Sequence, residues 1–200
     1  MAGEITLKKL DRVVFEIPIM GTSPLIVNRW SEKAKAMMLE AQQTTARPKK
    51  SPKDPVANFE ASQYRFGDDD DRHGFPATGF KAAIVHAARL FDGITQVQIK
   101  QTVLVEGEGR EQLVPIEFGE LTMREDTPRN ASGVADLRYR AQYHPWSTTL
   151  RVRTIAGQID EGSLIALVDA AGIGGVGEWR PTSPKSATGT YGTFEVVDQK

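Results

Sequence analysis

The chain has 200 residues, with 25 basic and 26 acidic side chains and a formal net charge of −1 at pH 7. Because domains usually hold roughly 100–200 residues, we expect residues 1–200 to form a single domain. A charge near zero argues against polyanion binding by the molecule as a whole, although a local groove can still attract one. The absence of cysteine excludes disulfides and thiolate metal sites.

The composition is that of a globular protein in water. Hydrophobic residues make up 40% of the chain and charged residues 26%. No apolar run approaches the ~20 residues of a membrane-spanning helix, and the first ten residues, MAGEITLKKL, lack the apolar core of a signal peptide. We therefore expect a cytoplasmic protein without a membrane partner.

The first third of the chain predicts two strands, a helix and an insertion. Residues 12–20 alternate strictly in polarity, which indicates a half-buried strand, and residues 25–27 add a short second one. Ser31 is placed to cap a helix with one apolar face, which should fade near residue 43. We expect a partly mobile insertion at about residues 28–73, because prolines and charges dominate residues 44–73.

The remainder predicts two more helices and several strands. Thr78 can cap a helix that ends near Gly93, and residues 97–105 and 113–123 favour a hairpin insertion. Two strands, at 134–143 and 147–155, would meet at a hairpin tip. We expect Trp146 at this tip to pack against the insertion, with an oligomer contact as the alternative. A helix starting near Glu161 and stopping at Gly172, then a strand at 191–197, complete the order.

That order, with the insertions set aside, is strand, helix, strand pair, helix, strand. It predicts an α+β fold of the ferredoxin-like (RRM-like) class, a split βαβ antiparallel sheet with insertions. Helices cover one face of such a sheet and leave the other face open.

Two segments resemble a known family. FPATGFKAAI (Phe75–Ile84) resembles the start of the first helix in the RAMP superfamily, the RNA-binding backbone subunits of CRISPR effector complexes. The glycine-rich segment Gly172–Val196 resembles that superfamily's loop between the second helix and the last strand. This resemblance implies a non-catalytic subunit that binds single-stranded nucleic acid, RNA before DNA, and assembles as a homo-oligomer or filament.

The chain also departs from the family pattern. Its loop carries few basic residues and includes Glu178, and a long insertion precedes the first family-like helix. These differences indicate a divergent member, phage-borne or carried by a mobile element, that keeps the fold.

The glycine-rich segment supplies the first candidate binding residues. Glycines let a backbone approach a phosphate chain closely and direct N–H groups at it. We select Gly174, Gly175 and Gly177 on this ground. The alternative is that the glycines only stop a helix and shape a surface turn.

Cationic and aromatic neighbours extend the candidate site. Lys81 lies in the first turn of its predicted helix, where a phosphate is also attracted by the helix N-terminus. Trp179 and Arg180 combine a stacking surface with a charge, and Lys185 is the other basic residue of the loop. Trp179 plugging the sheet edge is an equally open interpretation, as is a solvated role for Lys81.

Arginines at alternate positions predict a basic stripe on the sheet. Arg138 and Arg140 on one strand, and Arg151 and Arg153 on its neighbour, would each project from one face. We include Arg138 and Arg140 among the nucleic-acid-binding candidates, although arginines on exposed faces are often only solvated.

Catalysis has little support in the sequence. His73, His86 and His144 lack the spacing of a metal-binding helix motif, and no phosphate-binding loop or nucleophile motif occurs. The run Asp68–Asp71 could hold Mg²⁺, but a solvated acidic loop is favoured. We expect no enzyme activity, metal or cofactor.

Two alternatives to nucleic-acid binding stay open, a phage structural or assembly protein and a metal-dependent ribonuclease. The sequence leaves open RNA or DNA, any base preference and the number of copies.

Overall fold

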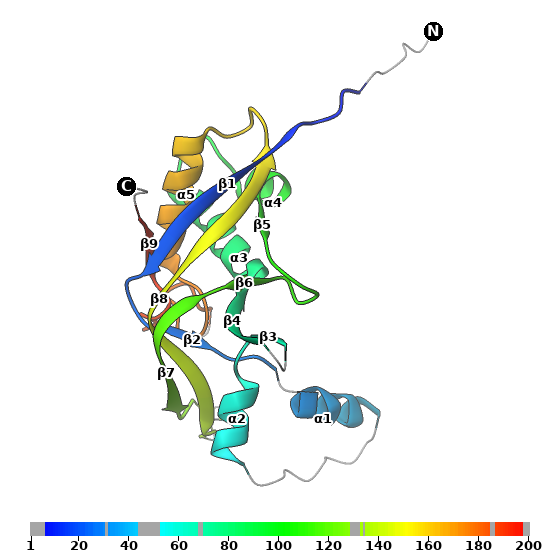
Figure 1. Ribbon diagram of the computed structural model, residues 1–200, viewed down its shortest axis with the longest axis vertical. Coiled ribbons are helices and arrows are strands. Elements are labelled where there is room, and N and C mark those ends of the chain that lie inside the picture. Colours follow the sequence, from blue (N-terminus) through cyan, green and yellow to red (C-terminus); the bar gives the residue numbers. More distant parts are fainter. Residues whose placement is uncertain are drawn as a thin grey trace.

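The computed structural model describes residues 7–30, 32–43, 53–67, 70–128, 133, 135–184 and 187–197. It is a mixed α+β fold with antiparallel sheets (Figure 1). The described helices are α1 (Glu32–Gln43), α2 (Pro55–Ala61), α3 (Ala77–Ala87), α4 (Gln96–Thr102) and α5 (Glu161–Gly174), with a 3-10 turn at Ala88–Leu90. The described strands are β1 (Arg12–Gly21), β2 (Leu25–Val27), β3 (Arg65–Gly67), β4 (Asp70–Pro76), β5 (Leu104–Glu106), β6 (Leu113–Pro115), β7 (Glu117–Asp126), β8 (Arg138–Ile155) and β9 (Phe194–Val196).

The long strand β8 organises the larger sheet. One of its edges pairs with β1 and then β2, and the other pairs with β5 and β7. The short strand β9 pairs with the far edge of β1, and every one of these pairings is antiparallel. The predicted strands at 12–20 and 25–27 are therefore confirmed. A smaller sheet of order β3-β4-β6 lies beside the larger one.

Helices α3 and α5 cover one face of the larger sheet. Figure 1 shows α3 and α5 side by side behind β1 and β8. Apolar side chains from both layers form the core, with the largest fully buried ones being Trp146, Tyr143, Phe80, Ile19, Leu25, Ile26, Ile84, Leu113, Leu150, Leu164 and Leu167. None of the described helices is both long enough and apolar enough to cross a lipid bilayer.

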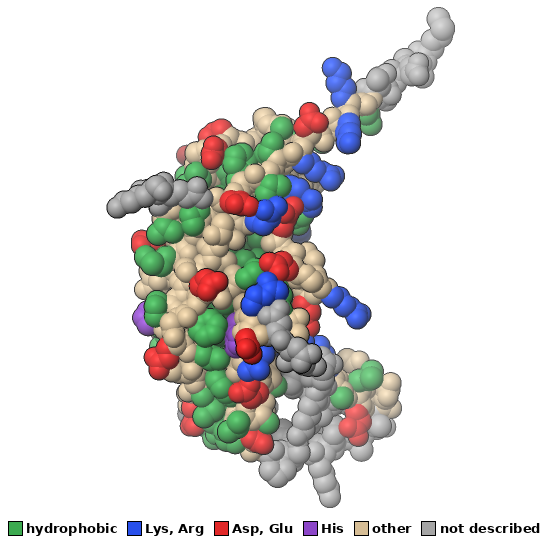
Figure 2. All heavy atoms as spheres, viewed as in Figure 1, with side chains coloured by type: hydrophobic (Ala, Val, Ile, Leu, Met, Phe, Trp, Pro, Cys, Tyr) green, Lys and Arg blue, Asp and Glu red, His purple; other side chains and the backbone are tan. Residues whose placement is uncertain are grey.

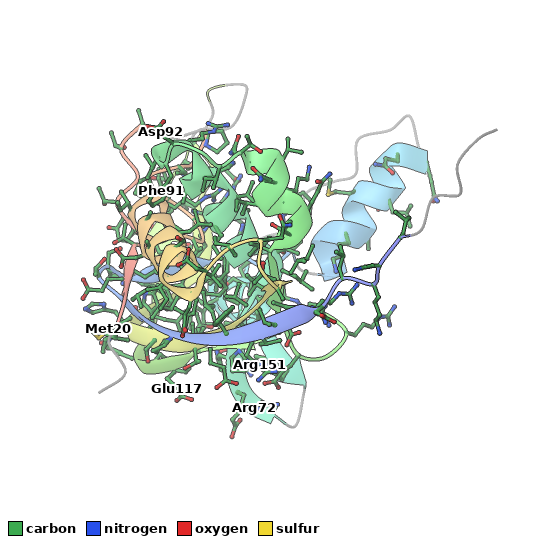
Figure 3. All side chains as sticks on the ribbon, turned by 90° about the horizontal axis from the view of Figure 1, so that it is seen from above. Met20, Arg72, Phe91, Asp92, Glu117 and Arg151 are labelled. Carbon is green, nitrogen blue, oxygen red and sulfur yellow. The ribbon has the colours of Figure 1, made fainter. Side chains whose placement is uncertain are left out.

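The opposite face of the sheet, on the side of Met20, Glu117 and Arg151, carries no described helix; we call it the uncovered face. Figure 2 looks onto this face and shows charged side chains of both signs on it. Figure 3, seen from above, shows Met20, Glu117 and Arg151 pointing away from α3 and α5.

The prediction of a strand at residues 97–105 was wrong. Most of that segment is helix α4, and only Leu104–Glu106 is strand. The reason is a capping box, in which the Thr95 side chain accepts from the Gln98 N–H and the Gln98 side chain accepts from the Thr95 N–H. With Ile99 buried, this local start signal outweighs the β-branched residues of the segment.

The predicted hairpin around residues 144–146 was also wrong, because β8 continues through it without a turn. Pro145 fits into the ladder opposite Gly119, where a Cβ atom would lie 2.8 Å from the proline Cδ. Trp146 is 1% exposed instead of lying at a tip. Its ring packs on Gly21, and its Nε1 donates to the Ser23 carbonyl at 2.8 Å.

Several boundaries of the insertion and helices differ from expectation. The described part of residues 28–73 holds α1, α2, β3 and most of β4, with Asp54 capping α2. Residues 44–52 and 68–69 lie outside the described residues. Thr78 does not cap α3, which begins at Ala77 after Pro76.

Helix α5 passes Gly172 and ends at Gly174, since Gly175 has a φ of +67°. Gly172 instead allows close packing, because a Cβ there would lie 1.8 Å from the Phe194 carbonyl oxygen.

Candidate nucleic-acid interface

The connection between α5 and β9, residues 175–193, is the glycine-rich loop of this structure. It is fastened to β2 and to the turn between β1 and β2 by backbone hydrogen bonds. The Glu178 N–H donates to the Ile26 carbonyl at 2.8 Å, and the Gly192 N–H donates to the Pro24 carbonyl at 2.8 Å. Val176 N–H donates to Gly192 across the loop at 2.9 Å. The loop is therefore an ordered layer against the end of the sheet.

Two of its glycines are required by close approach. Gly177 has a φ of +78°, and a Cβ there would lie 2.4 Å from the Ile26 carbonyl oxygen. Gly192 has a φ of +68°, and its Cβ would lie 1.8 Å from the Val176 carbonyl oxygen. Packing alone thus explains why glycine stands at both positions. Within the described residues the Gly177 N–H donates no hydrogen bond, so this donor stays available to a ligand.

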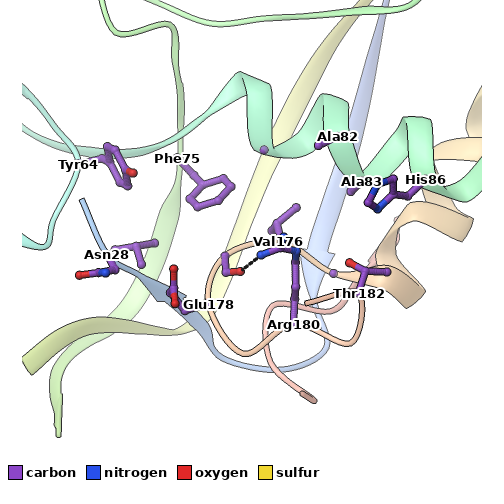
Figure 4. A pocket seen from close by; sticks show the side chains of 14 residues that line it. Asn28, Tyr64, Phe75, Ala82, Ala83, His86, Val176, Glu178, Arg180 and Thr182 are labelled. Atoms are coloured by element: carbon purple, nitrogen blue, oxygen red, sulfur yellow. Dashed lines mark hydrogen bonds between the residues drawn. The ribbon is translucent and has the colours of Figure 1, made fainter. Parts of the chain in front are cut away.

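A small cleft opens between the glycine-rich loop and α3, and we call it the loop–α3 cleft. Its volume is 190 Å³. Figure 4 shows the His86 ring pointing down from α3 and the Arg180 side chain rising from the loop into the same space. The residues that line it are Val27, Asn28, Tyr64, Phe75, Gly79, Ala82, Ala83, His86, Gly175, Val176, Gly177, Glu178, Arg180 and Thr182.

The cleft unites three of the predicted site residues, Gly175, Gly177 and Arg180. Arg180 is half-buried, and its Nη1 donates to the Gly177 carbonyl at 2.7 Å, so the guanidinium is held at the cleft wall. Gly174 lies just outside the lining, with its carbonyl accepting from the backbone N–H and the hydroxyl of Thr182.

Lys81 does not line the cleft. It follows Gly79 by two residues, which turns it about 200° around α3 from the cleft-lining face. Residues three, four and seven positions after Gly79 share its face of α3, and these are Ala82, Ala83 and His86, which line the cleft. This helical spacing is the sequence signal that could have identified His86. Lys185 lies outside the described residues.

A buried group of charges, which we call the Asp126 cluster, ties the loop to the sheet. The Oδ2 atom of Asp126 accepts from Arg140 Nη1 at 3.0 Å and from Trp179 Nε1 at 3.2 Å. Arg124 Nε donates to the other carboxylate oxygen at 2.8 Å, and Arg140 Nη2 lies 3.3 Å from Glu178. Asp126 is 7% exposed and Arg140 2%. No sequence motif around Asp126 indicated that it would hold the loop against the sheet.

The cluster changes the interpretation of two predicted site residues. Arg140 is a buried ion-pair partner and not part of an exposed stripe. Trp179 is half-buried at a φ of +56°, and its indole N–H is engaged by Asp126, which favours the edge-plugging interpretation over an open stacking platform.

The remaining arginines of the predicted stripe are neutralised. Arg138 is exposed and pairs with Asp136 at 3.3 Å. A hydrogen bond from Lys53 to the same carboxylate is the largest cause that lowers the pKa of Asp136. Lys53 and Arg138 therefore share one carboxylate, so this corner attracts phosphate less strongly than two unpaired cations would.

On the uncovered face, Arg151 contacts Glu16 at 2.6 Å and Glu106 at 3.3 Å, and Arg153 contacts Glu106 at 3.4 Å. These contacts follow the register, since Glu16 and Glu106 both lie opposite Arg151. The arginines project from one face as predicted, but each is balanced by acid.

The sequence did not indicate a buried pair between β4 and β8. His73 Nδ1 lies 2.8 Å from the Tyr143 hydroxyl, and the two residues are 7% and 0% exposed. Burial lowers the pKa of His73, with the nearby Arg65 charge acting in the same direction, and burial raises the pKa of Tyr143. Both groups are therefore neutral near pH 7 and belong to the core.

Among the described residues, no group of three or more His, Asp or Glu side chains is arranged to hold a metal ion. Asp68 and Asp69 of the acidic run lie outside those residues. Neither a protein-family model nor the sequence of a curated protein matches this chain.

Proposed function

We propose that this chain is a non-catalytic subunit that binds single-stranded nucleic acid, RNA in preference to DNA, in the loop–α3 cleft, and that it works as a homo-oligomer. The observation that carries the proposal is that Arg180, His86 and Gly177, whose N–H donates no hydrogen bond within the described residues, line one small cleft.

The size of the cleft favours a part of a long ligand. Small-molecule and cofactor sites usually measure roughly 300–1,000 Å³, whereas this cleft measures 190 Å³. One phosphate group or one splayed base is the kind of ligand portion that fits such a space. Repeated copies, each with a few contacts, would let a nearly neutral protomer hold a polyanion.

The side chains of the cleft suit an unstacked nucleotide. Arg180 supplies a cation, the Gly177 N–H a backbone donor, and Tyr64 and His86 aromatic rings. Glu178, the acidic residue in the lining, is balanced by Arg140 at 3.3 Å.

The strand order supports the finer fold assignment that accompanies this function. In order β9-β1-β8-β5, α3 lies between β1 and β5 along the chain, and α5 connects β8 to β9. A ferredoxin-like split βαβ unit requires this order and these crossovers. We include that assignment, and with it the RAMP-like relationship, in the proposal.

Fluorescence anisotropy with a labelled oligouridine tests the cleft directly. We expect Arg180→Gln to weaken binding about tenfold or more, because hydrogen bonds to charged groups contribute roughly 1.5–3 kcal/mol. The slope of log affinity against log salt should fall by about 0.7, the share of one lost phosphate contact on a single strand.

Arg110→Gln is the matched control. Arg110 is an exposed arginine in the turn between β5 and β6, away from the cleft lining. Equal losses in both variants, or wild-type affinity that does not change with salt, would refute the cleft as the binding site.

A second candidate function, a structural or assembly protein that binds other copies through the sheet, is favoured by one specific observation. The arginines of the uncovered face are paired with glutamates, which suits protein contacts better than phosphate contacts. Oligomers that keep their size after nuclease treatment, and that contain no nucleic acid by absorbance, would support this candidate over the first.

A further inference from the structure

The uncovered face of the sheet holds a groove of 630 Å³, larger than the loop–α3 cleft and on the other side of the sheet. Its lining comes from β1, β5, β6, β7 and β8, with apolar surface from Pro18, Val114 and Pro115. We call it the acidic groove, because four glutamates line it together with a single arginine. They are Glu16, Glu106, Glu108 and Glu117, with Arg151.

The charge balance of this groove stays negative after the ion pairs are counted. Arg151 is shared by Glu16 and Glu106. From outside the lining, Arg153 contacts Glu106 at 3.4 Å and Arg72 contacts Glu108 at 3.0 Å, so three arginines face four glutamates. Glu117 is exposed, makes no ion pair within the described residues and points away from the helices (Figure 3). A nucleic acid would be repelled here, whereas a basic, partly apolar segment would be attracted.

One such segment belongs to the chain itself. Residues 7–11 leave the body in extended form at the start of β1 (Figure 1), and we call them the N-terminal arm. Lys8 and Lys9 are exposed, and Leu7 and Leu10 are 87% and 61% exposed. None of these four side chains makes an ion pair or packs into the core among the described residues.

We propose that the N-terminal arm of one copy binds in the acidic groove of the next copy. Lys8 and Lys9 would meet the carboxylates of Glu108 and Glu117, and the leucines would cover the apolar lining. The arm starts about 23 Å along β1 from Pro18 in the groove, at ~3.3 Å per residue, and it points away from its own body.

Because the arm and the groove are different surfaces, the contact is head-to-tail. Such contacts build open chains or rings instead of closed dimers. The proposal draws on the uncovered face and the arm alone, so it stands or falls separately from the loop–α3 cleft.

Sedimentation velocity of nuclease-treated protein tests this contact without any nucleic acid. We expect the wild-type protein to form oligomers at low salt that dissociate as salt rises. The double variant Lys8→Glu/Lys9→Glu and the double variant Glu108→Lys/Glu117→Lys should each be monomeric.

Mixing these two variants should restore oligomers, because each reversed surface then finds a complementary one and each unchanged surface still has a partner. Restoration also shows that both variants are folded. Lys100→Glu and Glu125→Lys, which change exposed charges away from the arm and the groove, are the matched controls and should assemble as the wild type does.

A wild-type protein that is monomeric at every concentration and salt overturns the proposal. So does an arm variant that assembles normally, or a mixture that stays monomeric while both variants show the wild-type melting transition.

Discussion

Gly177 shows how one residue fixes the position of the glycine-rich loop. Its backbone lies so close to β2 that a Cβ atom would meet the Ile26 carbonyl oxygen at 2.4 Å. Gly109, in the turn between β5 and β6, has a similar φ of +64° but no heavy atom within 4 Å of a built Cβ. Comparing substitutions at Gly109 and Gly177 therefore distinguishes the cost of a left-handed backbone from the cost of a steric clash.

We predict that Gly109→Ala costs about 1–2 kcal/mol, the penalty for a left-handed alanine. Gly177→Ala should cost roughly 1–3 kcal/mol more, as overpacking does. Urea unfolding of both variants measures the difference, and equal losses would mean that the loop moves off β2 without penalty.

His73 makes a second prediction at the scale of single residues. Its pKa in the folded protein is below the ordinary value of 6.5, so the unfolded chain binds the proton more readily. Stability is therefore full above about pH 7 and falls as the pH drops through 6.5 toward the lowered folded-state pKa. The charged groups near it are Arg65, Glu60 and Asp71.

Unfolding midpoints in urea between about pH 7 and pH 5 check this expectation. His73→Phe keeps a ring in the site and should flatten that part of the pH dependence, whatever its effect on absolute stability. A variant with the wild-type pH profile would show that His73 does not contribute.

Residue patterns predicted part of the candidate site. Glycine content and the neighbouring Arg180 directed attention to the loop that lines the cleft with α3, because those properties are local. Lys81 was selected from its place in the first helical turn, and only the rotation of α3 against the loop shows that it faces elsewhere. Arg140 could not be distinguished from a surface arginine, since its partners come from β7 and from the loop.

Between elements, the Asp126 cluster is the strongest link of the glycine-rich loop to the sheet. It joins β7, β8 and the loop through one carboxylate that is 7% exposed. Removing one partner of a buried pair is costly because the remaining charge stays buried without compensation.

We predict that Asp126→Ala destabilises the protein by roughly 3–5 kcal/mol. Asp136→Ala is the control, because Asp136 also bonds a lysine and an arginine but at the surface, where such pairs contribute about 0–1 kcal/mol. Thermal and urea unfolding compare them. A loss at Asp126 no larger than that at Asp136 would contradict the structural role of the cluster.

Helices and strands were predicted correctly where the pattern was local, and wrongly where a distant residue decided the structure. Alternation over residues 12–20 and the apolar face of α5 are local patterns, and both predicted the right element. The prediction of a turn at His144-Pro145 was wrong because Gly119 in the neighbouring strand β7, 26 residues before Pro145, makes room for the proline ring. The residues next to Pro145 in the sequence do not reveal that β7 pairs with β8 at this point.

At the scale of the whole molecule, the two faces of the sheet have different characters. One side carries the helices and the loop–α3 cleft, and the other carries the acidic groove. The net charge of −1 sums over both faces, so it says little about either surface alone. Binding of nucleic acid on one side and of the N-terminal arm on the other would let copies assemble without competition between the two ligands.

The most direct measurement is ultraviolet cross-linking of the protein to a single-stranded oligouridine, followed by mass spectrometry of the cross-linked peptides. We predict cross-links in peptides that contain Tyr64, His86 or the loop residues that line the loop–α3 cleft between Gly175 and Thr182. We also predict that Arg180→Gln reduces those cross-links. Cross-links concentrated on the uncovered face around Arg151, or none above the level of an unrelated protein of similar charge, would contradict binding in the cleft.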